Sequence, residues 1–587
     1  MLLLLVILYL FFLKERLVEY SAAQNYANGK GNLERKIPKG SEFTVGEKFR
    51  VRVVLSKDLE NNANFDLFKL QVKDALRFWT KAIQPKKHPT QKILIERNCD
   101  NRVRSLMRPR YHYCEGGCNN VSICNGFEIP EKYLQKCRSS EKDVVSKTEV
   151  KKRGNIDFVL FVRSHNACIS ESTMATADTC EKDLDTDRPI AGSIVICSAM
   201  KYLDSNPGEL KRIIIHELGH TFGFDYWLFP YLRYDDGSPR TRRNPQTGEP
   251  ELPKHVNEGL KADRNTIQYV SRKWRTVSSD QTYQRVGLTL RSVVNFARNH
   301  FRCNELDAVD LESDGHGGSR LSHFERRLSI GEVMSPKVDI MASVSGLTLS
   351  FFKDTGWYDV NMSMAEPWDW GRNQGCELIF ESCGRFIKRQ KTASPWCNEP
   401  ITKKSGIRCI PHINAYGVCN LVNVGHTLKP EHTHFNNLPN VEPSRQNRFG
   451  GFDIHADYCP YMSMFNNVLS TTMNSHCGDI NNRKYQDVHS DSQYYGKKSR
   501  CFNYGTTYMS GNRSWSFSGC FQVKCTLRFE HLVYFRREWR ECPRQGGIIK
   551  TALENTRYDW IECPDFRDAC SVTEISGRIR KRKNKEN

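Results

Sequence analysis

A five-residue motif, HELGH at residues 216–220, carries side chains that could do hydrolytic chemistry. His216 and His220 are four residues apart, so on a helix they lie one above the other and their imidazoles could bind one zinc ion together. Glu217 points sideways from this pair, where it could take a proton from a water that zinc activates for attack on a peptide carbonyl. A match this short also arises by chance, so the surrounding residues must decide.

The residues around the motif predict a helix of about four turns. Asn206 suits the N-cap and Pro207 the first helical position, and Gly223 can end the helix in a left-handed conformation. Apolar residues at four-residue spacing form the stripe that would face the core: Leu210, Ile214, Leu218 and Phe222. The two histidines then fall on the adjacent stripe.

A catalytic zinc site needs a third protein ligand and an open position. In the short motif HExxHxxGxxH the third histidine falls six residues after the second, and that position is Tyr226. The candidates further along the chain are Glu258, His316 and His323. Glu258 would correspond to the glutamate-ligated zinc peptidases, whereas a histidine would correspond to the metzincins.

Metzincins also place a methionine in a tight turn under the metal. Met334 lies eleven residues after His323 and is followed by Ser335 and Pro336, and Met341 is a rival for the same turn. Before the motif, three β-branched segments predict strands at 49–55, 156–162 and 191–197, and the apolar spacing of 65–83 predicts a helix. This order predicts helices packed against a sheet, with a peptide substrate along the sheet edge.

Length and cysteine content predict a secreted protein of several domains. A chain of 587 residues exceeds one ordinary core, and its 22 cysteines favour disulfides formed in an oxidising compartment. The apolar run at residues 1–13 is too short to cross a bilayer and suits a signal peptide cleaved after Ala23. Nine cysteines lie up to Cys303 and thirteen from Cys376 onward, so full pairing needs at least one bridge between the two groups.

The formal net charge of +20 indicates acidic partners or simply a solvated basic surface. In a secreted protein the partners would be sulfated glycans or anionic extracellular surfaces rather than nucleic acid. No apolar carboxy-terminal tail predicts a glycolipid anchor, and no stable membrane span is expected. Three sequons, at Asn120, Asn361 and Asn512, fit a secreted glycoprotein.

Five further segments accompany HELGH and Gly223: NHFRC at 299–303, GGSRLSHFERR at 317–327, EVMSP at 332–336, LTLSFFKDTGWY at 347–358 and WGRNQGC at 370–376. Together they resemble leishmanolysin, a metzincin protease family with an interrupted zinc motif. The resemblance implies that His216, His220 and His323 bind one Zn²⁺, that Glu217 is the catalytic base, and that Met334 forms the turn beneath the metal. It also implies a disulfide between Cys303 and Cys376.

The resemblance implies an α+β fold with a metzincin-type catalytic domain, in which a twisted sheet lies beside the active-site helix. We expect this order: signal peptide 1–23, polar pro or linker segment 24–46, catalytic domain 47–224, central domain with the third histidine 225–365, cysteine-rich and mostly irregular or β domain 366–575, and basic tail 576–587. No cysteine precedes Cys99, so latency through a cysteine bound to the zinc is not expected.

The function predicted from these observations is that of a secreted, monomeric zinc endopeptidase acting on protein substrates. Two alternatives remain open. One is a catalytically silent secreted protein that uses the same fold for binding or adhesion, and the intact Glu217 argues against it. The other is a glutamate-ligated zinc peptidase that uses Glu258.

Overall fold

The structure is a computed structural model, and its chain divides into residues 1–39 and 40–587. The described residues are 40–570 without 61–63, 146–153, 166–172, 198–206, 253–258, 315–318, 338, 340–341, 391–394, 400–406, 411–413, 465–474, 481, 483–492, 497, 509–513, 527–529, 555–556 and 565. The predicted signal peptide, the basic tail and Asn206 lie outside them. Within the described residues, no helix has both the length and the apolar character needed to cross a membrane.

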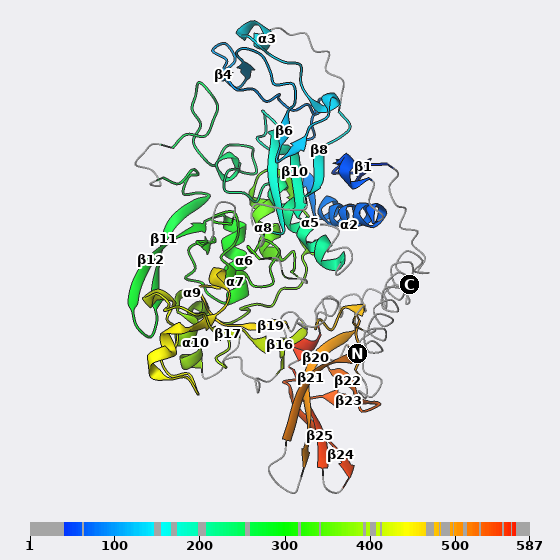
Figure 1. Ribbon diagram of the computed structural model, residues 1–587, viewed down its shortest axis with the longest axis vertical. Coiled ribbons are helices and arrows are strands. Elements are labelled where there is room, and N and C mark those ends of the chain that lie inside the picture. The colour runs from blue at the N-terminus through cyan, green and yellow to red at the C-terminus, as the bar shows by residue number, and fades with distance from the viewer. Residues whose placement is uncertain are drawn as a thin grey trace, which may run out of the picture. The chain divides into compact units, whose positions relative to one another are not determined.

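A five-stranded sheet forms the amino-terminal half of the structure (Figure 1). Its order is β1 (Glu42–Val45), β2 (Val51–Leu55), β8 (Phe158–His165), β10 (Pro189–Cys197) and β9 (Ala175–Lys182). Strands β2, β8 and β10 are parallel, whereas the two outer strands run antiparallel to their neighbours. The predicted strands correspond to the three parallel ones, whose apolar runs are buried as parallel sheets require.

Two helices pack against this sheet and against each other: α2 (Phe65–Ala82) and α5 (Pro207–Phe222). Both agree with the predicted helices to within two residues at each end. Trp79 of α2 is fully buried, and its indole N–H donates to the carbonyl of Ile215 on α5 at 3.0 Å. A buried indole with a satisfied donor holds the two helices in one register.

Strand β1 lies inside the segment expected to be a linker. It pairs with β2, and Glu42 binds Arg52 and the hydroxyl of Tyr133. Between α2 and β8 the chain makes short elements cross-linked by disulfides: β3 (Ile83–Pro85), β4 (Arg102–Arg104), β5 (His112–Cys114), β6 (Ile123–Cys124), β7 (Phe127–Glu128) and α3 (Glu141–Val145). The disulfides here are Cys99–Cys114, Cys118–Cys137 and Cys124–Cys180.

Between α5 and the cysteine-rich part, the described residues form a long hairpin, short strands and the helices α6 to α8. The elements are β11 (Ile267–Arg275), β12 (Asp280–Leu288), α6 (Arg291–Phe301), β13 (Val309–Asp310), α7 (Arg326–Ser329), α8 (Gly346–Asp354) and β14 (Tyr358–Val360). β14 pairs with β3 and so returns the chain to the amino-terminal half. One continuous hydrophobic cluster includes residues from Val45 through this region to Tyr461.

The cysteine-rich part contains small sheets, short helices and one larger antiparallel sheet. Its smaller elements are α9 (Cys376–Phe380), α10 (Cys383–Gln390), β15 (Arg408–Ile410), β16 (Ala415–Cys419), β17 (Leu421–Asn423), β18 (Phe449–Gly451), β19 (Met462–Met464) and α11 (Phe566–Ala569). The larger sheet has the order β23 (Glu538–Cys542), β22 (His531–Phe535), β21 (Ser514–Cys525), β20 (Ser499–Tyr508), β25 (Arg557–Cys563) and β24 (Gly547–Glu554). The mixed α+β class is therefore confirmed.

The disulfide between Cys303 and Cys376 is present, as the resemblance implied. It joins the end of α6 to the start of α9 and supplies the bridge that the odd cysteine counts demand. Six further disulfides lie in the cysteine-rich part: Cys383–Cys459, Cys397–Cys419, Cys409–Cys501, Cys477–Cys520, Cys525–Cys570 and Cys542–Cys563. No cysteine among the described residues is free.

Candidate metal centre

Three histidine rings meet at one point between α5 and the loop before α7. The Nε2 atoms of His216 and His220 are 3.1 Å apart, and His323 Nε2 lies 3.1 Å from the first and 3.2 Å from the second. His323 follows His220 by 103 residues. The fold thus brings together the two helical histidines and the distant one.

The other ring nitrogen of each histidine faces a backbone carbonyl. His216 Nδ1 lies 2.5 Å from the oxygen of Val333, His220 Nδ1 2.7 Å from that of Phe224, and His323 Nδ1 2.9 Å from that of Ser319. A carbonyl only accepts, so each Nδ1 carries the proton and each Nε2 presents a lone pair. Burial lowers the pKa of His216 to about 3 and that of His323 well below its ordinary value, which keeps both rings neutral.

This donor set fits a zinc ion. Three lone pairs pointing at one another repel unless a cation lies between them, and neutral imidazole is a preferred zinc ligand. Tetrahedral Zn–N bonds of about 2.0–2.1 Å separate two ligand nitrogens by about 3.3 Å, close to the separations observed here. Three protein ligands also leave the fourth position free for water or substrate, as in catalytic zinc sites.

The end of α5 orients His220. Gly223 has φ of +141°, and a Cβ there would lie 2.8 Å from the ring of Trp357. This turn brings the carbonyl of Phe224 back to His220 Nδ1, so the residue that ends the helix also selects the tautomer. Tyr226, at the position of the short motif's third histidine, packs its ring near Trp227 and Phe229 instead.

The turn at Val333 and Met334 joins both sides of the site. The carbonyl of Val333 accepts from His216, and the carbonyl of Met334 accepts from the amide of Phe324, next to His323. The side chain of Met334 is fully buried, and a Cβ added to Gly219 of α5 would lie 2.5 Å from its Sδ. The methionine therefore lies directly against the helix that carries two ligands.

The Glu332 carboxylate supports this turn. One of its oxygens accepts from the amide of Met334 at 2.5 Å. The other accepts from the hydroxyls of Ser345 and Thr348, at 2.9 and 2.5 Å. Ser345 is also the N-cap of α8, so the turn is tied to the start of that helix.

Buried arginines hold the chain that follows His323. Arg326 is fully buried, pairs with Asp453 at 2.8 Å, and donates to the hydroxyl of Tyr461 at 3.1 Å. Arg327 pairs with Asp457, which also binds Arg285. Asp453, Asp457 and Tyr461 belong to the cysteine-rich part, so that part supports the loop of the third histidine.

Glu217 lies in the helix between the two ligands and is 5% exposed. In the part of the chain that the structure describes, its carboxylate accepts no hydrogen bond, and burial raises its pKa to about 8. A buried carboxylate beside a metal-binding position is the arrangement expected of a general base.

The alternative ligand candidates and the other clusters of potential metal ligands give no support for a different zinc site. Glu258, His316 and Met341 lie outside the described residues. Two further groups of potential ligands contain Cys383 with Cys459 and Cys542 with Cys563, and in each group the two sulfurs are joined in a disulfide. Disulfide sulfurs are not thiolates, so neither group is a metal site of the usual kind.

Comparison with known proteins agrees with this geometry. The family model described as Leishmanolysin (peptidase M8) matches residues 120–577. The chain belongs to the leishmanolysin family. It is 29% identical to the leishmanolysin-like peptidase of Caenorhabditis briggsae over 85% of this chain and 79% of that protein. It is also 29% identical to that of Drosophila pseudoobscura pseudoobscura over 85% and 76% of the two chains. Identity to leishmanolysin of Leishmania donovani is 25% over 76% of this chain and 64% of that protein.

Membership in the leishmanolysin family makes the protein a zinc-dependent metallopeptidase, and its three histidines fit the zinc site. Sequence reasoning missed several supports of this site, namely the edge strand β9, the carbonyl of Val333, and the pairing of Arg326 and Arg327 with acids in the cysteine-rich part. A backbone carbonyl leaves no trace in the sequence. The consecutive arginines after His323 were visible, but Asp453 and Asp457, which they pair with in the cysteine-rich part, lie more than a hundred residues away.

Proposed function

We propose that this protein is a secreted endopeptidase that binds one zinc ion through His216, His220 and His323 and uses Glu217 as the general base. The observation that supports it most directly is the convergence of three Nε2 lone pairs within 3.2 Å of one another. The ten disulfides between described cysteines, from Cys99–Cys114 to Cys542–Cys563, support passage through the secretory pathway.

Zinc at this site would supply Lewis acidity that lowers the pKa of a water molecule towards about 7. The Glu217 carboxylate would accept a proton from that water and later donate it to the leaving amine of the cleaved peptide. No described residue donates a hydrogen bond to Glu217, so its carboxyl oxygens are free for this transfer, and a zinc ion bound beside it would favour the ionised form that burial alone disfavours.

The substrate would bind as an extended peptide along β9. Among the described residues, this strand is the last in the sheet order and pairs with β10 alone, and it contacts α5. Most of its residues are only partly buried, so its outer edge can pair with another strand. Pairing through backbone groups would place a peptide beside the ligand helix while leaving its sequence little restricted.

The decisive experiment compares the wild type with Glu217→Gln and His323→Ala, using zinc content and casein cleavage as readouts. We expect Glu217→Gln to retain zinc and lose at least about a hundredfold in activity, because general-base catalysis contributes about 10²–10⁴-fold. His323→Ala should lose both zinc and activity. Glu209→Gln, an equal change on the same helix but two turns earlier, should retain both.

Equal casein cleavage by the wild type and Glu217→Gln would contradict the proposed mechanism, and zinc binding without any cleavage would favour the silent binding protein. Zinc retention in His323→Ala together with zinc loss in Glu258→Ala would favour the glutamate-ligated alternative. We propose a monomer, which light scattering of the purified protein would test.

A further inference from the structure

The hairpin of β4 and β5 presents two apolar side chains to solvent at its tip. Leu106 is 89% exposed and Met107 71%, the highest exposed fractions among the large apolar side chains that the structure describes. Strand pairing from Arg102 to Cys114 and the Cys99–Cys114 disulfide hold the base of this hairpin. Two adjacent side chains this exposed bury almost no apolar surface in the fold, so folding does not account for their apolar character.

The tip is an ordered turn. The carboxylate of Glu141, at the start of α3, accepts from the amides of Leu106 and Met107, at 3.3 and 3.0 Å, and from the hydroxyl of Ser105. These bonds lower the pKa of Glu141, so it stays ionised at neutral pH. They satisfy the backbone amides of Leu106 and Met107 within the protein, while the two apolar side chains stay exposed.

Arginines outnumber acids around this apolar pair, and Glu141 is the one acid that the structure shows bonded to its backbone. Between Arg97 and Cys114 the chain carries five arginines and a single acid, Asp100. Arg104 donates to the carbonyl of Pro109, and Arg110 to that of Leu184, a further apolar residue that is 41% exposed. Among the described residues, none of Arg104, Arg108 and Arg110 pairs with an acidic side chain.

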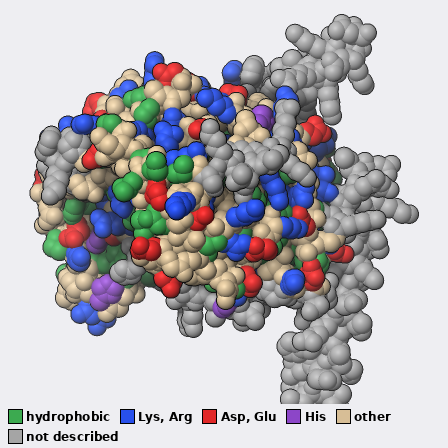
Figure 2. All heavy atoms as spheres, turned by 90° about the horizontal axis from the view of Figure 1, so that it is seen from above, with side chains coloured by type: hydrophobic (Ala, Val, Ile, Leu, Met, Phe, Trp, Pro, Cys, Tyr) green, Lys and Arg blue, Asp and Glu red, His purple; other side chains and the backbone are tan. Residues whose placement is uncertain are grey.

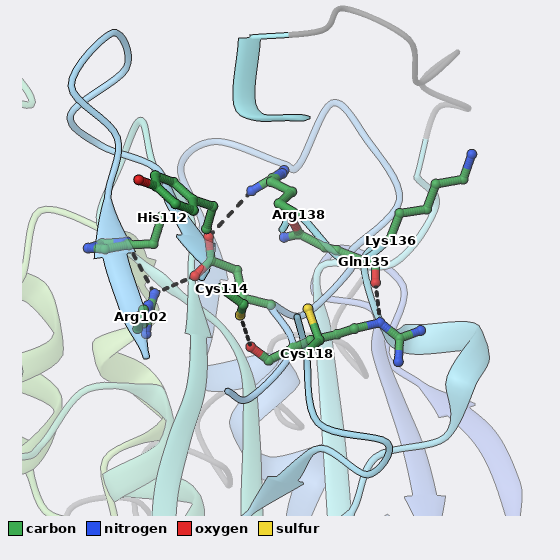
Figure 3. A pocket seen from close by; sticks show the side chains of 10 residues that line it. Arg102, His112, Cys114, Cys118, Gln135, Lys136 and Arg138 are labelled. Atoms are coloured by element: carbon green, nitrogen blue, oxygen red, sulfur yellow. Dashed lines mark hydrogen bonds and ion pairs between the residues drawn. The ribbon is translucent and has the colours of Figure 1, made fainter. Parts of the chain in front are cut away.

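A basic pocket lies behind the same hairpin. Figure 3 shows Arg102 and Arg138 beside it and Lys136 extending away from it. Glu96 pairs with both arginines, whereas Lys136 makes no ion pair within the described residues. Figure 2 views the molecule from the end that carries β4 and α3, and it shows Lys and Arg side chains spread over this face together with Asp and Glu side chains and small apolar groups.

We propose that this tip, Leu106 and Met107 with Arg104, Arg108 and Arg110, docks the protein onto anionic phospholipid membranes. The apolar pair would enter the boundary between headgroups and acyl chains, and the arginines would remain among the lipid phosphates. The shape matches what an interfacial anchor needs: a narrow apolar apex, arginines around it, and a turn whose two apical amides are already bonded to Glu141.

A sulfated glycan could bind the arginines, but it has no apolar surface that would bury Leu106 and Met107. A protein partner would ordinarily bury a larger patch than the two side chains at this apex. The lipid interface is the occupant that uses both features. An anionic extracellular surface was one of two interpretations of the net charge of +20, and this proposal assigns it to the β4–β5 tip.

The test is sedimentation of the full chain with vesicles of phosphatidylcholine alone or phosphatidylcholine mixed with phosphatidylserine. We expect binding to the mixed vesicles, weakened by salt. The double variant Leu106→Ser/Met107→Ser should bind about a hundredfold more weakly. Arg108→Glu should bind about tenfold more weakly, because it removes one positive charge near the surface and adds a negative one.

Two matched controls are available on β24, in the cysteine-rich part. Ile548 is 58% exposed and Lys550 is also exposed, so Ile548→Ser and Lys550→Glu repeat the same kinds of change away from the tip and should bind like the wild type. The tip variants should cleave casein normally, and Glu217→Gln should bind vesicles normally. The membrane proposal and the protease proposal can therefore be contradicted independently of each other.

Wild-type protein that ignores the mixed vesicles would overturn the proposal. So would vesicle binding that is unchanged in the Leu106→Ser/Met107→Ser variant. Retention on immobilised heparin that depends on Arg108 but not on the apolar pair, without vesicle binding, would assign the surface to glycans instead.

Discussion

His216 and His220 come from consecutive turns of one helix, whereas His323 reaches the same point from a loop 103 residues after His220. The first pair is positioned by helix geometry, by burial of the apolar stripe of α5, and by the turn at Gly223. The third histidine is positioned by backbone bonds to the Met334 turn and by buried ion pairs with the cysteine-rich part. The two helical histidines, the local half of the site, are therefore positioned by one short segment of the chain, whereas the position of His323, the distant half, depends on contacts with distant segments.

Removing a ligand from either half should have the largest effect. His220→Ala and His323→Ala should each lower zinc affinity by more than about a hundredfold, because loss of a ligand costs more than the 10–100-fold typical of a ligand's supporting partner. The two losses should be similar, since coordination does not depend on how far apart the ligands lie in sequence. Titration with a competing chelator measures this, and tight zinc binding in only one variant would show that the halves contribute unequally.

Arg326→Met should weaken the support of His323 while leaving His216 and His220 in place on α5. It leaves the buried Asp453 and the partly exposed Asp339 without their guanidinium, so we expect a loss of about 3–5 kcal/mol in the free energy of unfolding, mostly from the unpaired Asp453. Zinc affinity should fall as well, because the loop of His323 loses its support. Denaturant unfolding with and without zinc measures both effects.

The matched control is Arg372→Met. Arg372 pairs with Asp369 at 2.8 Å, but both side chains are about half exposed, so its loss should cost no more than about 1 kcal/mol. If Arg326→Met had the same zinc affinity and the same free energy of unfolding as this control, the contacts of Arg326 with the cysteine-rich part would not stabilise the site.

The local half of the site could be read from the sequence, and the distant half only in part. Spacing and end residues predicted α5 and placed His216 and His220 on one face. Hydrophobic patterns likewise found α2 and the three buried parallel strands, because burial on both faces imposes apolar residues. His323 competed with Glu258 and His316 until the family resemblance favoured it, since spacing across a long insertion carries no geometric information.

The missed elements share a physical reason. Strand β9, with the sequence ATADTCEK, is an edge strand of small and polar residues, so it has no hydrophobic alternation to reveal it. Asp453 and Asp457 look like surface acids in sequence but are 5% and 1% exposed, because arginines from another region cover them. Pairing of this kind is set by tertiary contacts.

Gly219→Ala tests the contact between the two halves. Alanine normally stabilises a helix interior relative to glycine by about 0.5–1 kcal/mol, but here its Cβ would lie 2.5 Å from Met334 Sδ. We expect a net loss of about 1–3 kcal/mol, as in other overpacked cores. Met334→Ala in the same chain should remove the clash, so the double variant should be more stable than the sum of the single effects predicts. If the losses in the free energy of unfolding, measured with denaturant, were additive, Met334 would not be the residue that an alanine at position 219 clashes with.

Ser345→Ala should have the smallest effect. The change removes the N-cap of α8 and one of the bonds to Glu332, which together are worth about 1–2 kcal/mol. The Glu332 carboxylate keeps its bonds from the amide of Met334 and the hydroxyl of Thr348, so the turn should hold its position and zinc affinity should change less than about threefold. Support from several weak bonds tolerates the loss of one, whereas Arg326 concentrates its support in a single side chain. A large drop in zinc affinity for Ser345→Ala, measured beside Arg326→Met, would reverse that contrast.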